Sequence, residues 1–204
     1  MGFYQEQIVP LLINLAMRQG KLAEYRRRVV PAAEGHVLEI GIGSGLNLPF
    51  YSHEVDKVIG LDPSPKLLSM AQHQVRPTAF DLEFIEGTAE AMPIESASID
   101  TVVTTWTMCS IPNVCDSLTE IRRVLKPTGR LLFVEHGRAP EARVQWWQDQ
   151  LTLAWKRLSG GCHLNRQVED IIRDAGFRIE HLEKGYMRGP KPMTFMYEGR
   201  ARSY

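Results

Sequence analysis

Short apolar runs alternate with stretches of helical periodicity along most of this 204-residue chain. The runs have the length of buried strands, and the apolar residues between them recur at helical spacing. Alternation of strands with helices favours a mainly parallel sheet with right-handed crossovers. We expect strands at 37–40, 57–61, 82–85, 99–104 and 130–135, and helices at 4–18, 22–30, from 46, from 64, at 114–125 and at 141–158.

The last part of the chain departs from this alternation. One more helix is expected after Asn165 as its cap, but the strands at 177–183 and 193–202 have only a turn between them, so they should pair as an antiparallel hairpin. The predicted fold class is α/β: a Rossmann-like, seven-stranded, mostly parallel sheet. We expect one domain, 1–204. Residues 1–33 should form an N-terminal helical cap, residues 34–136 the cofactor-binding core, and residues 137–204 the substrate-side helices and the C-terminal hairpin.

A glycine-rich turn follows the first expected strand, with Gly41, Gly43 and Gly45 at every second position. Glycine lets the backbone adopt unusual dihedral angles and approach a ligand closely. The carboxyl end of a parallel sheet is where open α/β folds bind cofactors. A tight turn with no ligand is the alternative, because glycines alone are a weak signal.

Two acidic residues bear on which ligand this turn would accept. Asp62 ends the second expected strand roughly 20 residues after Gly41, a spacing that suits a carboxylate bonded to ribose hydroxyls. Glu39, just before the turn, would repel a pyrophosphate but suits a cation, and the third glycine of a pyrophosphate-binding loop is missing. These residues favour a nucleoside with a cationic tail over a dinucleotide.

Composition narrows the function classes. The 24 basic and 24 acidic residues balance, so no nucleic-acid partner is indicated. The three cysteines form no C-x-x-C pair and no metal-ligand spacing, so we expect no metal and a reducing, cytoplasmic environment. The apolar segment 8–17 is too short to span a membrane, and we expect no stable membrane insertion. Nothing in the sequence defines the oligomeric state.

In its ordered set of motifs the chain resembles the class I S-adenosylmethionine-dependent methyltransferases. The resemblance implies S-adenosyl-L-methionine as cofactor and S-adenosyl-L-homocysteine as product. A narrower set is similar to the thiol S-methyltransferases of animals and their bacterial relatives, and bacterial phospholipid N-methyltransferases share its first half. The broad motifs are 37–45, Asp62, 87–93, 100–105 and 125–131; the narrower ones include Leu46-Asn47-x-x-x-Tyr51, Cys109-Ser110, Phe133-x-Glu135-His136 and Gly161-Cys162-x-Leu164-x-Arg166.

The resemblance also assigns cofactor contacts. The glycine turn would approach the methionine and ribose parts, Asp62 would bind both ribose hydroxyls, and Glu39 would act from beneath the turn. Many relatives have an aspartate at the position of Thr88, so nearby groups must contact the adenine here. Tyr4 is a lid contact or, equally, an aromatic staple. The full expected set is Tyr4, Glu39, Gly41, Gly43, Gly45, Asn47, Asp62, Pro63, Thr88, Ala89, Glu90 and Thr105.

For the acceptor side, His136 and His163 are candidate general bases with Glu135 as orienter, although each histidine could be a structural hydrogen-bonder. Cys109 and Cys162 are expected to be small buried hydrophobes, because this reaction needs no covalent enzyme intermediate. Trp155 is expected in the core. The expected wall of an apolar substrate pocket is Trp106, Met108, Trp146, Trp147 and Met187.

These features favour an S-adenosylmethionine-dependent methyltransferase acting on a small, lipophilic thiol. A phospholipid or quinone-type N-, O- or C-methyltransferase is the alternative within the same class. A NAD-dependent oxidoreductase is disfavoured by Glu39 and by the missing third glycine. A module that binds the cofactor without turnover is a further alternative.

Overall fold

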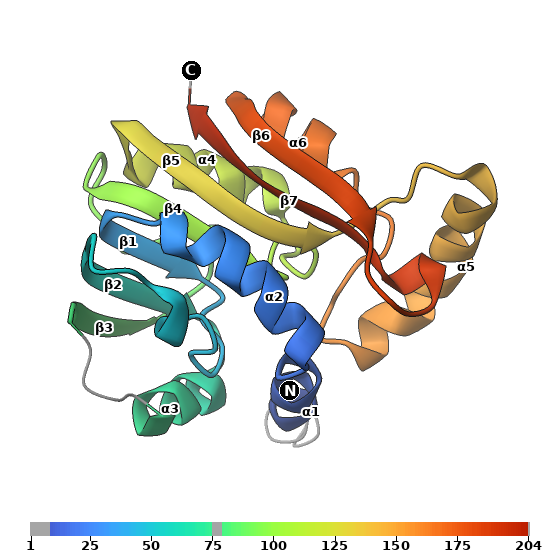
Figure 1. Ribbon diagram of the computed structural model, residues 1–204, viewed down its shortest axis with the longest axis horizontal. Helices are drawn as coiled ribbons and strands as arrows, with labels where there is room; N and C mark the ends of the chain where they lie inside the picture. The colour runs from blue at the N-terminus through green and yellow to red at the C-terminus, as the bar shows by residue number, and fades with distance from the viewer. Residues whose placement is uncertain (1–8, 75–78, 204) are drawn as a thin grey trace.

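Seven strands form one sheet in the computed structural model, which describes residues 9–74 and 79–203 (Figure 1). The strand order is β3-β2-β1-β4-β5-β7-β6, with β7 antiparallel to both of its neighbours and the other pairs parallel. The predicted seven-stranded fold and its antiparallel C-terminal hairpin are therefore confirmed. The strands are β1 (Gly35–Ile40), β2 (Val55–Asp62), β3 (Asp81–Glu86), β4 (Ile99–Thr105), β5 (Leu125–His136), β6 (Phe177–Tyr186) and β7 (Phe195–Ser203).

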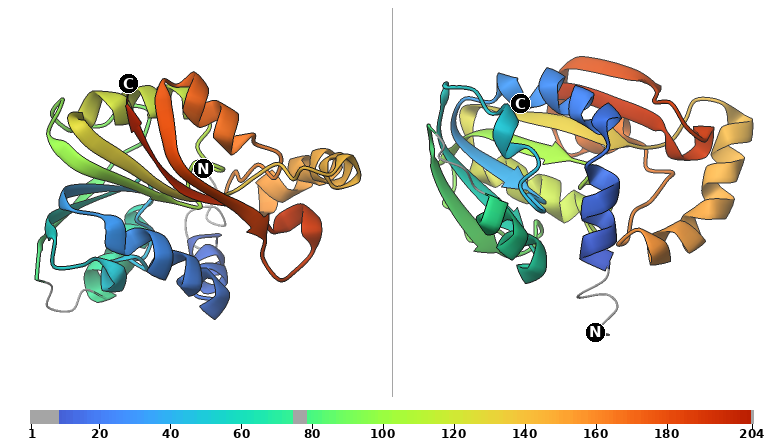
Figure 2. Two further views of the ribbon diagram at one scale, coloured as in Figure 1. Left: turned by 45° about the horizontal axis from the view of Figure 1, so that its top comes forward. Right: turned by 60° about the horizontal axis from the view of Figure 1, so that its bottom comes forward.

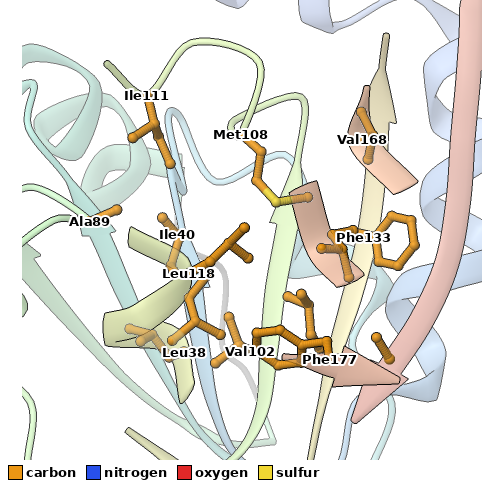
Figure 3. Packing of buried hydrophobic residues seen from close by; sticks show 14 of the residues in the cluster. Leu38, Ile40, Ala89, Val102, Met108, Ile111, Leu118, Phe133, Val168 and Phe177 are labelled. Atoms are coloured by element: carbon orange, nitrogen blue, oxygen red, sulfur yellow. The ribbon is translucent and has the colours of Figure 1, made fainter. Parts of the chain in front are cut away.

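Helices pack against both faces of the sheet (Figure 2). Side chains alternate between the faces of a strand, so Leu38 and Ile40 of β1 enter one apolar cluster and Val37 enters another. Helices α4 (Val114–Val124) and α6 (Val168–Asp174) cover the first cluster, part of which Figure 3 shows. Helices α2 (Gly20–Val29) and α3 (Pro65–Gln74) contribute to the second.

Two further helices, α1 (Val9–Met17) and α5 (Ala142–Leu158), complete the fold together with short 3₁₀ turns. The prediction of two N-terminal helices outside the sheet is confirmed. Ser64 caps α3 as expected, since its hydroxyl oxygen accepts the Leu67 N–H at 3.3 Å. Within the described part of the chain, no helix is long and apolar enough to cross a bilayer. The 3₁₀ turns are Val30–Ala32, Leu48–Phe50 and Lys191–Met193.

The helix expected to begin near Leu46 is absent from the described residues. A single 3₁₀ turn, Leu48–Phe50, joins the glycine turn to β2 instead. The side chain of Asn47 points inward, where its amide donates to Glu39 and Thr105, and this anchors the segment in an irregular conformation. The sheet face that such a helix would cover is packed by α2, which comes from earlier in the chain.

The predicted cap of the last helix is also wrong. Helix α6 begins at Val168 with Gln167 at its N-cap position. Asn165 lies before the helix and donates its amide to the carboxylate of Asp149 on α5, at 2.8 Å. The side chain of Asn165 therefore binds Asp149, which is distant in sequence, instead of capping the helix.

Candidate functional site

A cavity of about 510 Å³ lies at the carboxyl edge of the parallel strands. The segments that follow β1, β2, β3 and β4 line it, and α1 closes one side. This is the edge where open α/β sheets bind ligands. The residues that carry most of its chemistry are Arg26, Glu39, Gly41, Gly43, Asn47, Asp62, Thr105 and Trp106.

The glycine turn forms the floor of this cavity. Gly41, Gly43 and Gly45 have φ values of 70°, 56° and 79°, in the left-handed region that glycine tolerates best. A Cβ at Gly41 would lie 2.5 Å from Cγ2 of Thr107, so only glycine fits there. Gly41 and Gly43 line the cavity, whereas Gly45 packs behind it, near Leu48. Gly45 therefore shapes the turn but does not itself face the cavity.

Asp62 braces the turn from the end of β2. Its Oδ2 accepts the N–H of Gly43 at 2.9 Å and its Oδ1 accepts the N–H of Ser64 at 2.8 Å. Burial raises the pKa of this carboxyl group, while the two backbone donors oppose the shift. The side chain is 5% exposed and lines the cavity, so it can accept further hydrogen bonds only from a group inside the cavity.

Glu39 lies beneath the turn in a polar network. It is 1% exposed, and its two oxygens accept from the Asn47 amide at 2.9 Å and the Tyr51 hydroxyl at 2.7 Å. The same amide of Asn47 donates to the Thr105 hydroxyl at 3.0 Å. Desolvation raises the pKa of Glu39 to about 8, although both hydrogen bonds act against it. A cation placed in the cavity would favour the ionised form.

Arg26 belongs to this network but was not singled out from the sequence. Its Nε donates to Oδ1 of Asn47 at 3.0 Å, and its Nη1 donates to the carbonyl of Met17 at 3.1 Å. The guanidinium lies 5.0 Å from the centroid of the Trp106 ring. Burial lowers the pKa of Arg26, and the charge of Glu39 opposes that shift. Its spacing from Leu22 on the buried face of α2 was the available sequence signal.

Trp106 occupies the cavity wall just after β4 with a strained backbone. Its φ is 53°, in the left-handed region that a bulky side chain rarely adopts. The N–H of Trp106 donates to the carbonyl of Val134 at 2.7 Å, which fixes the bend. Its ring packs in a T-shaped arrangement with that of Tyr25, with 6.2 Å between the ring centroids. Strain of this kind clusters at functional sites.

The cavity also brings together the remaining residues expected on the adenine side. Pro63, Thr88, Ala89 and Glu90 all line it. Tyr4 lies outside the described residues. Helix α1 adds lining residues that the sequence analysis did not single out, namely Val9, Pro10, Ile13, Asn14 and Met17; their helical spacing on one face of α1 was the signal.

Most of the expected substrate wall lies elsewhere, which corrects that expectation for every member except Trp106. Met108 is buried in the core, where it points toward Phe133 (Figure 3). Trp146 and Trp147 are 54% and 45% exposed on α5 and contact each other edge to face at 4.7 Å. Met187 packs against the second apolar cluster. Their positions follow from tertiary packing, because aromatic content alone does not say which way a helix faces.

The two histidines proposed as bases do not line the cavity. The ring nitrogens of His136 lie 3.5 and 3.7 Å from Sγ of Cys162, in a buried cluster. Nδ1 of His163 lies 3.1 Å from the carbonyl of Cys109, and burial lowers the pKa of this imidazole. Neither histidine therefore faces the cavity, and a role as catalytic base stays a prediction for both.

Glu135 does not orient a histidine either. Its buried carboxylate accepts the backbone N–H groups of Thr107, Met108 and Cys109 at 2.9, 3.0 and 3.3 Å. Burial raises the pKa of this group, and the three donors oppose the shift. Glu135 therefore fixes the segment that follows β4, which includes cavity-lining Thr107.

Comparisons with known proteins agree on a family. A methyltransferase domain model matches residues 38–133. The chain is 33% identical over 187 residues to the thiol S-methyltransferase TMT1B of Rattus norvegicus, covering 85% of this chain and 76% of that protein. It spans 66% and 65% of the human thiol S-methyltransferases TMT1B and TMT1A. It is 30% identical over 186 residues to the phosphatidylethanolamine N-methyltransferase of Cereibacter sphaeroides, covering 87% and 88%.

Solved structures share the architecture. A chain of the Haloferax volcanii complex between the Trm112 methyltransferase activator and a methyltransferase superposes with a TM-score of 0.71. The alignment covers 96% of this chain and 97% of that one, at 18% sequence identity. Identity at this level shows a common fold and carries nothing further about substrate.

Proposed function

Because this chain belongs to the class I S-adenosylmethionine-dependent methyltransferases, we propose that it transfers the methyl group to a small, lipophilic thiol. The observation that carries the proposal is the cavity, in which the glycine turn and Asp62 lie on one side and an apolar helix face on the other. Similarity to thiol S-methyltransferases supports the choice of acceptor.

The proposed cofactor position follows from the donors and acceptors in the cavity. The carboxylate of Asp62 would accept both ribose hydroxyls, and Gly41 and Gly43 leave room for the backbone to approach the nucleoside. Pro63 and the segment 87–90 would border the adenine. The ammonium of the methionine part would lie near Glu39, whose ionised form a cation stabilises. When bound, the cofactor supplies an activated methyl group on a sulfonium.

The acceptor would occupy the part of the cavity bordered by α1. Ile13, Met17, Trp106 and Ile111 line that part, and such a surface favours an apolar molecule. Enclosing the acceptor there holds its nucleophile near the methyl group. Positioning of this kind contributes about 7–11 kcal/mol at best to lowering a reaction barrier.

A thiol reacts as its thiolate, and an ordinary thiol has a pKa of roughly 8.5. Among the described residues that line the cavity there is no imidazole, and Arg26 is the single cationic side chain. A guanidinium near the sulfur favours the anion. We propose that the acceptor is bound as thiolate, with Arg26 stabilising the charge, and that a reducing cytoplasm keeps the acceptor in its thiol form.

A phospholipid N-methyltransferase is the second candidate. It is favoured by the Cereibacter sphaeroides relative, which this chain matches over 88% of that protein's length. An amine acceptor must lose its proton before it can attack, so the ammonium form would have to give up a proton inside the cavity. A buried cation such as Arg26 favours the neutral amine as well, so this residue does not separate the two candidates.

A transfer assay with isotope-labelled methyl donor separates the candidates. We would compare an alkanethiol with the alcohol and amine of the same chain length, and with phosphatidylethanolamine vesicles. The proposal expects a thioether product and S-adenosyl-L-homocysteine in equal amounts from the thiol alone. Transfer restricted to the vesicles would refute the thiol assignment while leaving the methyltransferase family intact. Thermal stabilisation by S-adenosyl-L-homocysteine, with none by NAD, is the accompanying cofactor test.

A further inference from the structure

Two cysteines and a histidine converge behind the cavity. Cys109 follows β4, His136 ends β5, and Cys162 lies between α5 and α6, so three separate segments supply the side chains. All three are buried, and one ligand atom from each lies within 4.8 Å of the others. The two sulfur atoms are 3.2 Å apart, and the cysteines are free thiols.

The distances suit a common metal ion better than a disulfide. Tetrahedral zinc with bonds of about 2.3 Å to sulfur and 2.0–2.1 Å to nitrogen puts two sulfurs roughly 3.8 Å apart, and sulfur and nitrogen roughly 3.5 Å apart. Nε2 of His136 lies 3.5 Å from Sγ of Cys162, which matches the expected separation; because Nδ1 is almost as near, at 3.7 Å, the imidazole must turn to direct one nitrogen at the ion. The sulfur pair must open by roughly half an ångström for zinc, but would have to close by more than one to reach about 2.05 Å.

The charges also fit. Two thiolates and a neutral imidazole carry two negative charges, which a divalent cation cancels, so the complex is neutral and tolerates burial. Thiolate and imidazole are the donors that zinc accepts, and two cysteines with one histidine form a known three-ligand set. Glu135 does not complete the set, because its oxygens accept three backbone N–H groups. We propose that Cys109, His136 and Cys162 bind one zinc ion.

The site would tie together two segments of the cavity wall. Ser110 and Gly160 both line the cavity, and each is within two residues of a proposed ligand. The hydroxyl of Ser110 lies 3.6 Å from Sγ of Cys109. The segments already touch, since the N–H of His163 donates to the carbonyl of Cys109 at 2.8 Å. A bound zinc ion would fix this wall through side chains as well as backbone. This role does not depend on which acceptor is methylated.

The test is metal binding by the full chain. Purified protein incubated with zinc and then dialysed should retain one zinc per chain, measured by elemental analysis. Cobalt(II) in its place should give the intense near-ultraviolet absorption of thiolate bound to cobalt. Cys109→Ala and Cys162→Ala should lose both signals, whereas Cys115→Ser, which changes the exposed third cysteine, should keep them.

A second measurement does not depend on whether those variants fold. In urea at a concentration that begins to unfold the wild-type protein, so that burial alone no longer shields the two buried cysteines, zinc should slow the reaction of these two with a thiol reagent, and a chelator should restore the faster rate. The proposal is overturned if cobalt gives no thiolate band. It is equally overturned if zinc content is unchanged in Cys162→Ala, or if all three thiols react at the same rate with and without zinc.

Discussion

Replacing Glu39 by glutamine should abolish most of the pH dependence of stability that this carboxyl group creates. Its pKa is raised from 4.5 to about 8 by burial, so the folded protein holds a proton that the unfolded chain releases. Stability from this group is then fully present below pH 4.5 and is lost as the pH rises toward 8. Glutamine is close in shape to the protonated carboxyl group, and its amide can pair with the same neighbours, Asn47 and Tyr51.

The magnitude follows from the two pKa values. Between pH 5 and pH 8, a group whose pKa shifts from 4.5 to about 8 on folding reduces the free energy of unfolding by about 3–4 kcal/mol. The wild type should lose this amount relative to Glu39→Gln over that range. At pH 5 the two proteins should differ little, and at pH 8 the variant should be the more stable one.

The measurement is urea unfolding of both proteins at several pH values from 5 to 8. Because all other groups titrate in both proteins, the difference between the two curves isolates Glu39. Glu86→Gln, at the exposed end of β3, is the matched control for the chemical change itself. A constant difference between wild type and Glu39→Gln across the range would refute the reasoning.

Three further outcomes are expected. Asp62→Asn should weaken the binding of S-adenosyl-L-homocysteine at least about 100-fold, measured by calorimetry. The reason is that two charge-assisted hydrogen bonds of about 1.5–3 kcal/mol each are lost. The control variant Asp56→Asn, which changes an exposed residue of the same strand, should bind normally. Gly41→Ala should destabilise the protein by about 1–3 kcal/mol in denaturant unfolding, because φ of Gly41 is 70° and Thr107 occupies the space of the added Cβ. Gly20→Ala should not destabilise it, because a Cβ at Gly20 would meet no atom within 4 Å. Equal stabilities of the two variants would contradict the strain argument. The rate of thiol methylation should rise about tenfold per pH unit below the pKa of the acceptor thiol, and His163→Asn should leave this pH profile unchanged. A pH profile that follows the ionisation of an imidazole in the wild type, and is lost in His163→Asn, would instead support His163 as the base.

Local sequence patterns were sufficient to predict most of the fold. Alternating strand and helix signals were sufficient for the parallel sheet, because period and turn residues depend on near neighbours in sequence. The pairing of the glycine turn with Asp62 was also predictable, since both belong to one strand-turn-strand unit of regular length. The missing helix after Gly45 was not, because the side chain of Asn47 is held by Glu39 and Thr105 across the sheet.

The sequence by itself determined the order of the strands, the glycine turn and the acid opposite it, because each depends on residues close together along the chain. Only the tertiary structure decided that Arg26 joins Glu39 in the cavity and that Trp146 faces solvent. It alone brought together Cys109, His136 and Cys162, whose spacing along the chain resembles no metal motif. Packing sets these contacts, since segments distant in sequence share one sheet edge and the buried volume selects which side chains meet there.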